Sequence, residues 1–267
     1  MERLRQAWIW VFVIGVLLFV TALLAVQAGS QRFFPAVIVF GAVIVPASMV
    51  AYFSGYERKL DRGLHGPVPT SSVVWIFIAS GMTGIVAAAI IEFETLRASG
   101  IPQLFGVGLV EETAKLIFPM AIYIRRPYKS EADGLLFGIA SGMGFASLET
   151  IGYGFTTYLK SQGDVGTVEQ LLLIRGLFSP ALHASWTGLV CAVLWRERNR
   201  AGHPKFNMAI LGTFVLAIVL HASWDIVSSI NGFPIWALTI SYLAIAAIGL
   251  TLLIRRMQEA ASNKNNA

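Results

Sequence analysis

The feature that most constrains this chain is a succession of long apolar segments separated by short polar connections. Crossing the hydrocarbon core of a bilayer takes about 20 residues of α-helix, because a spanning segment must satisfy its own backbone hydrogen bonds. Windows of this length run over residues 7–26, 33–53, 73–91, 104–123, 132–153, 171–195, 206–230 and 234–254. The sequence therefore predicts an all-α fold, a polytopic membrane bundle of about eight transmembrane helices.

Composition indicates the same surroundings. Hydrophobic residues make up 56% of the 267 residues and charged residues only 13%, far from the balance of a soluble domain. The formal net charge is +5, but the Lys and Arg residues stand in short patches between apolar segments, where they act as topology signals. We therefore expect the lipid bilayer around the protein and no nucleic acid as a partner.

The basic residues also predict the orientation. Of the 20 Lys and Arg residues, Lys115 and Arg175 lie within spans and Arg32, Arg97 and Lys160 lie on one side, which leaves 15 on the other side. Because Lys and Arg concentrate on the cytoplasmic side of a membrane, both termini are predicted to be cytoplasmic. The predicted location is a cell membrane, with the bacterial cytoplasmic membrane as the favoured one.

The chain is predicted to form a single membrane domain over residues 1–267, with a catalytic core at about 104–230 and a disordered tail at 260–267. The start of the chain imitates a signal peptide, with Arg3 and Arg5 followed by the first apolar run and by small residues near position 28. Because this run is longer than the apolar part of a usual signal peptide, we predict a first span, and cleavage of 1–28 stays open.

Ionisable residues at membrane depth indicate where function lies, because they are costly there and mark functional sites. The tetrapeptide His-Ala-Ser-Trp occurs twice inside apolar spans, beginning at His183 and at His221. Carboxylates stand at similar depth at Glu111, Glu112, Glu149 and Asp225. Two histidines and several carboxylates are the parts of a metal-dependent or acid/base hydrolase, although each residue alone could be an ordinary contact between helices.

Helical periodicity predicts partners for some of these residues. Glu111 and Lys115 are one turn apart and can pair, while Glu112 points about 100° away and needs a partner on another helix. His221 and Asp225 can bind one metal ion, or Asp225 can orient the imidazole. A stripe of glycines at 134, 138 and 142 forms a flat face for close helix packing, and it continues toward Glu149, with Tyr153 as a possible hydrogen-bond partner of that carboxylate.

At these residues the chain resembles the PrsW family of intramembrane proteases, within a superfamily that includes CAAX prenyl proteases and bacteriocin-processing proteins. The matching motifs, in order, are Glu111-Glu112-x-x-Lys115, Phe145-x-x-x-Glu149, His183 and His221-x-x-x-Asp225. The wider superfamily often has histidine where Glu149 stands and asparagine where Asp225 stands, which disfavours prenyl-protein processing. The resemblance implies that Glu111 and Glu112 are the catalytic pair and that the substrate is a membrane-anchored protein, such as an anti-sigma factor.

We therefore predict an intramembrane peptidase, favouring a metal-assisted mechanism. Zn²⁺ would be held by Glu149, His183 and His221, with Asp225 as a further ligand or an orienting group. One glutamate of the catalytic pair would move protons and Lys115 would hold the other. The alternatives are a metal-independent glutamate protease and a non-enzymatic transporter coupled to protons or ions.

The predicted topology also locates the site. At 1.5 Å per residue, Glu112 lies roughly 13 Å and His183 roughly 18 Å below the outer ends of their spans, and His221 lies roughly 13 Å below its own. These depths place the site in the outer half of the bilayer and predict a cleft that opens to the extracytoplasmic side. Neither the substrate's identity nor the oligomeric state follows from the sequence.

Overall fold

The computed structural model describes residues 6–60, 66–95, 101–125, 128–230, 232 and 234–265. Every predicted span corresponds to one helix, and no strand occurs in these ranges. The helices are α2 (Ala7–Gln27), η1 (Gln31–Phe33), α3 (Phe34–Leu60), α4 (Thr70–Thr95), α5 (Ile101–Arg125), α6 (Glu131–Lys160), α7 (Val165–Ala201), α8 (Met208–Ser229) and α9 (Ile235–Asn265). The predicted all-α class is confirmed.

Six helices of the described chain are long and apolar enough to cross a membrane, namely α2, the segment from η1 through α3, α6, α7, α8 and α9. The remaining two predicted spans are less regular in hydropathy. The apolar part of α4 is the shorter stretch Thr70–Val86, and α5 carries Glu111, Glu112 and Lys115 in its middle. The protein is therefore a polytopic membrane helix bundle, and α5 carries three ionisable residues within two turns.

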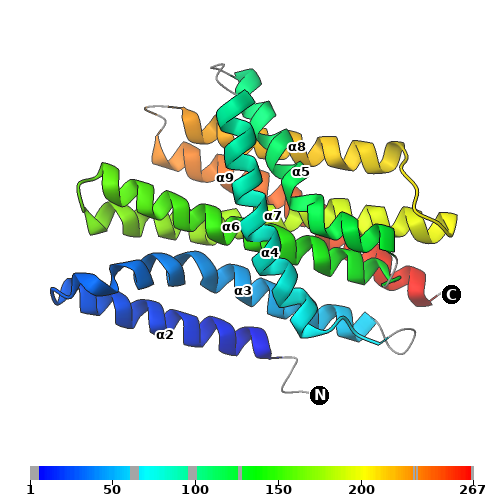
Figure 1. The fold of residues 1–267 in the computed structure, drawn as a ribbon, viewed down its shortest axis with the longest axis horizontal. Helices are drawn as coiled ribbons and strands as arrows, with labels where there is room; N and C mark the ends of the chain where they lie inside the picture. Colours follow the sequence, from blue (N-terminus) through cyan, green and yellow to red (C-terminus); the bar gives the residue numbers. More distant parts are fainter. Residues whose placement is uncertain are drawn as a thin grey trace.

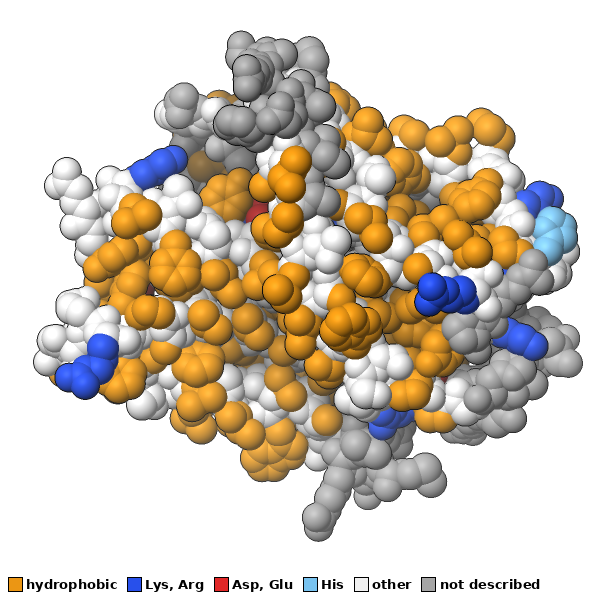
Figure 2. Space-filling view, viewed as in Figure 1, with side chains coloured by type: hydrophobic (Ala, Val, Ile, Leu, Met, Phe, Trp, Pro, Cys, Tyr) orange, Lys and Arg blue, Asp and Glu red, His pale blue; other side chains and the backbone are white. Residues whose placement is uncertain are grey.

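The long helices lie alongside one another in alternating directions, with α4 and α5 inclined across them (Figure 1). The start of α2 and the end of α9 lie toward the same end of the bundle. Figure 2 shows hydrophobic side chains across the middle of one face, with most of the visible Lys and Arg side chains toward the two ends of the helices. This distribution suits an apolar zone flanked by polar interfaces.

The centre of the bundle is the pair α6 and α7, which bury 83% and 78% of their apolar windows, against 11% for α2. The glycine stripe of α6 makes this contact close. A Cβ atom on Gly142 would lie 2.5 Å from the carbonyl oxygen of His183, and one on Gly138 would lie 2.6 Å from that of Thr187. The predicted flat face is thus confirmed, and it sets the α6 backbone directly against the part of α7 that carries His183.

Local sequence determines where the central helices begin and end. Ser130 and Asp133 form a reciprocal capping box at the start of α6. The side chains of Asp164 and Asn207 accept hydrogen bonds from backbone N–H groups at the starts of α7 and α8. Gly202, with a φ of 73°, ends α7 in the left-handed conformation that favours glycine.

The last helix, α9, continues to Asn265, so residues 260–265 are helical where the sequence favoured a disordered tail. Residues 266 and 267 lie outside the described part. Arg256 forms ion pairs with Glu131 at the start of α6 and with Glu259 one turn along α9. The hydroxyl of Tyr56 donates to the carbonyl of Met257 at 2.9 Å. These contacts hold α9 to α6 and α3.

Candidate active site

The predicted site residues of four helices come together in the interior. Glu111, Glu112 and Lys115 extend from α5, His183 from α7 and His221 from α8, and all five are buried. Glu149 joins them from α6 and Asp225 from the turn of α8 after His221. Because contacting residues of the site are as far apart in sequence as Glu112 and His221, which are 109 residues apart, the packing of the helices is what assembles the site.

Glu112 is the most heavily bonded member of this cluster. Lys115 Nζ donates to its Oε1 at 2.7 Å, and His221 Nδ1 lies 2.9 Å from the same oxygen. Thr187 Oγ1 donates to Oε2 at 3.3 Å. The prediction that Glu112 finds partners on other helices is confirmed. Since a carboxylate can only accept, the proton of a neutral His221 is held on Nδ1 and Nε2 is the basic ring atom.

Glu111 has a different setting from its neighbour. It pairs with Lys115 as predicted, with 3.3 Å between Oε2 and Nζ, and the same oxygen lies 3.4 Å from His221 Nε2. Glu111 also lines a cavity of about 260 Å³ together with Glu149 and Tyr153. Of the two adjacent glutamates, Glu112 is thus enclosed by donors, whereas Glu111 faces space in which a water molecule and a peptide group could lie.

Glu149 is held by two residues of α7. Arg175 Nη2 lies 2.7 Å from Oε1, and His183 Nε2 lies 3.3 Å from Oε2. Tyr153, the hydrogen-bond partner that the sequence suggested for Glu149, instead packs its ring 4.0 Å from the guanidinium of Arg175. The role of Arg175 was missed by sequence reasoning. Its place on the same helical stripe as His183 was the available signal.

Aromatic rings hold the two imidazoles in place. Trp186 stacks on His221 with 4.8 Å between ring centroids, and the two histidine rings lie 5.7 Å apart nearly at right angles. Phe145 lies beneath Lys115 Nζ at 4.2 Å. In the second His-Ala-Ser-Trp copy, Trp224 packs on a tyrosine of α9 instead. The two copies are therefore not equivalent, a distinction that the repeated tetrapeptide did not reveal.

Comparison with known proteins agrees with this geometry. The model of the PrsW family, described as intramembrane metalloproteases, matches residues 68–253, which is more than half of the chain. The chain belongs to the PrsW family. Protease PrsW of Oceanobacillus iheyensis is 23% identical over 177 residues, covering 63% of this chain and 76% of that protein. No solved structure matches the chain.

The family match covers the whole site and leaves α2 and α3 outside it. Membership confirms the predicted class, an intramembrane protease, over the transporter alternative. Membership also implies that the substrate is a protein and that the chain works in a membrane.

Asp225 is placed more loosely than its motif suggested. Its Oδ2 lies 3.6 Å from His221 Nε2, beyond hydrogen-bond distance, and its side chain is 24% exposed. In this PrsW protein the other ring nitrogen, Nδ1, donates the hydrogen bond that orients His221, and Glu112 accepts it. Asp225 keeps an oxygen close to the basic atom of the ring.

The family description implies a metal ion, and His and Glu side chains are donor types that zinc accepts. Two ligands of one tetrahedral zinc lie about 3.3–3.6 Å apart, given bonds of about 2.0–2.2 Å. The 3.3 Å between His183 Nε2 and Glu149 Oε2 matches this edge, and the 3.6 Å between His221 Nε2 and Asp225 Oδ2 lies at its upper end. Buried atoms of three candidate ligands, His183 Nδ1, Glu149 Oε2 and Asp225 Oδ2, make no hydrogen bond. Among the side chains that the structure describes, however, no three converge around one point.

Proposed function

We propose that this PrsW-family protein hydrolyses a peptide bond in single-span, membrane-anchored proteins, a class that includes anti-sigma factors. The observation that carries the proposal is the setting of Glu111, which faces a cavity beside His221 Nε2. A carboxylate in a largely dry interior, aimed at space for a water molecule, is a candidate general base. Co-expression with single-span reporters tagged at both ends, compared with the Glu111→Gln variant, tests it by the appearance of two fragments.

Each residue of the cluster has a separate role in this proposal. Glu111 takes a proton from water as the hydroxyl adds to the carbonyl carbon, and it returns that proton to the amine nitrogen as the C–N bond breaks. Glu112 holds His221 in one tautomer. Lys115 offsets the charge of both glutamates, and Arg175 fixes Glu149 beside His183.

We also propose that zinc assists this reaction, held by Glu149, His183 and His221, with Asp225 as a further ligand or a neighbour of His221. The metal would make bound water more acidic and polarise the peptide carbonyl. The donor types and the 3.3 Å between His183 Nε2 and Glu149 Oε2 support this choice. A metal-free variant of the mechanism is supported by the 3.4 Å approach of Glu111 to His221, since that pair could activate water directly.

We expect purified wild-type protein to carry about one divalent ion, and chelation to remove both the ion and the activity. The double change His183→Ala and His221→Ala should lose the ion, because a catalytic zinc site has only three protein ligands. His203→Ala is the matched control, since that histidine is exposed on the α7–α8 connection. Metal content per protein by mass spectrometry measures the effect. Full activity in a verified metal-free preparation would support the glutamate-only mechanism instead.

We further propose that the cavity opens to the extracytoplasmic side. Thr156, an exposed residue of α6 close to the α6–α7 connection, lines this cavity. In a Cys191→Ser background, Thr156→Cys is expected to react with an impermeant thiol reagent added to intact cells. His203→Cys, at the predicted cytoplasmic end, should react only after lysis. The opposite labelling pattern would show that the topology is inverted and that the cavity opens to the cytoplasmic side.

A further inference from the structure

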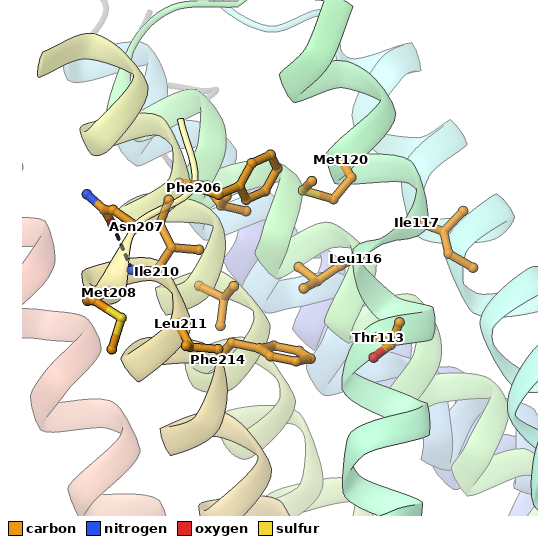
Figure 3. A pocket seen from close by; sticks show the side chains of 12 residues that line it. Thr113, Leu116, Ile117, Met120, Phe206, Asn207, Met208, Ile210, Leu211 and Phe214 are labelled. Atoms are coloured by element: carbon orange, nitrogen blue, oxygen red, sulfur yellow. Dashed lines mark hydrogen bonds between the residues drawn. The ribbon is translucent and has the colours of Figure 1, made fainter. Parts of the chain in front are cut away.

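The cavity that touches the catalytic cluster is a small one. It has a volume of about 260 Å³ and lies between α4, α5 and α6, with Glu111 and Glu149 in its wall. It is named here the Glu111 pocket. A larger cavity of about 840 Å³ lies between α5, α7 and α8, and its described lining residues include none of the cluster (Figure 3). Residues that shape the Glu111 pocket therefore determine what can lie beside the reacting groups.

The Glu111 pocket combines acidic and apolar walls. Its apolar lining residues come from α4 and α6 and are Ile85, Ala89, Phe145 and Leu148. An acidic substrate side chain would be repelled by Glu111 and Glu149. A basic one would lose its water while these carboxylates already have cationic partners, Lys115 and Arg175. The walls therefore favour an apolar side chain.

The volume of the Glu111 pocket restricts the size of that side chain. About 260 Å³ is smaller than the roughly 300–1,000 Å³ of sites for drug-sized ligands. The attacking water takes about 30 Å³ of it, and the peptide group to be cut must also fit. The remaining space suits one short side chain, such as that of alanine, valine or leucine.

Gly152 leaves space open in the wall of this pocket. Helix α6 contains six glycines, at 134, 138, 142, 144, 152 and 154. At five of them an added Cβ would lie 1.8 to 2.8 Å from an atom of another helix, so close packing explains the glycine. At Gly152 an added Cβ would meet no atom of the described residues within 4 Å. Gly152 nevertheless lines the Glu111 pocket.

Helix formation also gives no reason for a glycine at this position. Glycine is the weakest helix former apart from proline, because it loses the most backbone freedom on folding. Gly152 lies three residues after Glu149 and four before Thr156, on the face of α6 that lines the pocket. It is about 4.5 Å along the helix axis from Glu149. A side chain at 152 would take up room beside the reacting groups.

We propose that the Glu111 pocket receives one short apolar side chain of the substrate, next to the bond that is cut, and that Gly152 sets the size it accepts. Gly152 is then a specificity-determining residue. This role rests on the proposed function, in which Glu111 activates the attacking water. Seating the side chain positions the adjoining peptide group for attack.

Enlarging residue 152 tests this role with single-span reporters that carry Ala or Leu on one side of the cut bond and then on the other. For one of the two sides, Gly152→Leu is expected to shift the ratio of kcat/KM at least tenfold toward Ala, since one methylene group changes selection in an apolar pocket by about 10- to 200-fold. Mass spectrometry of the fragments locates the cut bond. An unchanged ratio, or equal losses on both reporters, would overturn the role.

Gly212→Leu is the matched control for this change. Gly212 is a helical glycine of α8 at which an added Cβ also meets no described atom within 4 Å, and it lines neither cavity. Its ratio should equal that of the wild type. Gly152→Ala should keep or raise Tm, because alanine is the better helix former. A lower Tm would show that packing requires Gly152 and would overturn the role.

A labelling arm separates the pocket from catalysis. Gly152→Cys in a Cys191→Ser, Glu111→Gln background is reacted with a small uncharged thiol reagent. We expect a synthetic peptide with a span of about 20 Leu and Ala residues to slow labelling at 152 but not at Gly212→Cys. Equal labelling at 152 with and without the peptide would overturn the role. Protection at 152, without cleavage of any reporter by the wild-type protein, would preserve the pocket and refute the proposed function.

Discussion

Replacing Glu111 with glutamine is expected to lower kcat for a single-span reporter by about 10²- to 10⁴-fold, the range for loss of a general acid–base group. The change keeps the side chain's size and leaves Lys115 paired with Glu112 at 2.7 Å, so the protein should remain folded. The cavity that Glu111 lines would lose its base. Fragment formation per unit of folded protein, with folding checked by gel filtration and circular dichroism, measures the effect.

Glu112→Gln is expected to cost less activity, about 10- to 100-fold, because Glu112 acts through His221. An amide that presents its oxygen to Lys115 cannot hold the imidazole as firmly. A larger loss from Glu112→Gln than from Glu111→Gln would reverse the two roles. Unaltered cleavage by both single variants and by the double variant would remove the glutamates from the mechanism.

Lys115→Met is expected to destabilise the protein by about 3–5 kcal/mol, the usual cost of removing one partner from a buried ion pair. Lys115 is fully buried and contacts both glutamates, so the change would strand two carboxylates in the interior. We expect a lower yield of folded protein and a lower Tm in detergent. Lys129→Met, at an exposed lysine, serves as the matched control.

The double variant Lys115→Met and Glu112→Gln distinguishes charge from packing. Removing one of the two stranded carboxylates should restore part of the lost Tm, because fewer uncompensated charges remain buried. Additive losses in the double variant would indicate that Lys115 stabilises mainly through its contact with Phe145. A Tm equal to that of the wild type for Lys115→Met would contradict the buried ion-pair assignment.

Much of the fold was predictable because hydropathy and helical periodicity are local properties. Each of the eight apolar windows corresponds to one helix, and the glycines at 134, 138 and 142 do make a close helix contact. The spacing of Glu111 and Lys115 was sufficient to predict their pairing. The end of α9 was less predictable, because residues 262–265 are all polar yet continue an established helix.

The arrangement within the site was only partly predictable. Motif order identified Glu149, His183, His221 and Asp225 as site residues, but not that Arg175 would hold Glu149 or that Trp186 would stack on His221. Both contacts join different turns or different helices, so no spacing along the chain encodes them. The metal ligand set stays a prediction, since His183 and Glu149 lie close together but no three candidate ligands among the described residues surround one point.

The sequence by itself determined the class of fold, the number of helices and the residue types available for chemistry, because each depends on composition and on spacing within one helix. Only the tertiary structure decided that Glu112 is enclosed while Glu111 faces a cavity. Adjacent residues on one helix point about 100° apart, and what each direction meets depends on how neighbouring helices are rotated and inclined.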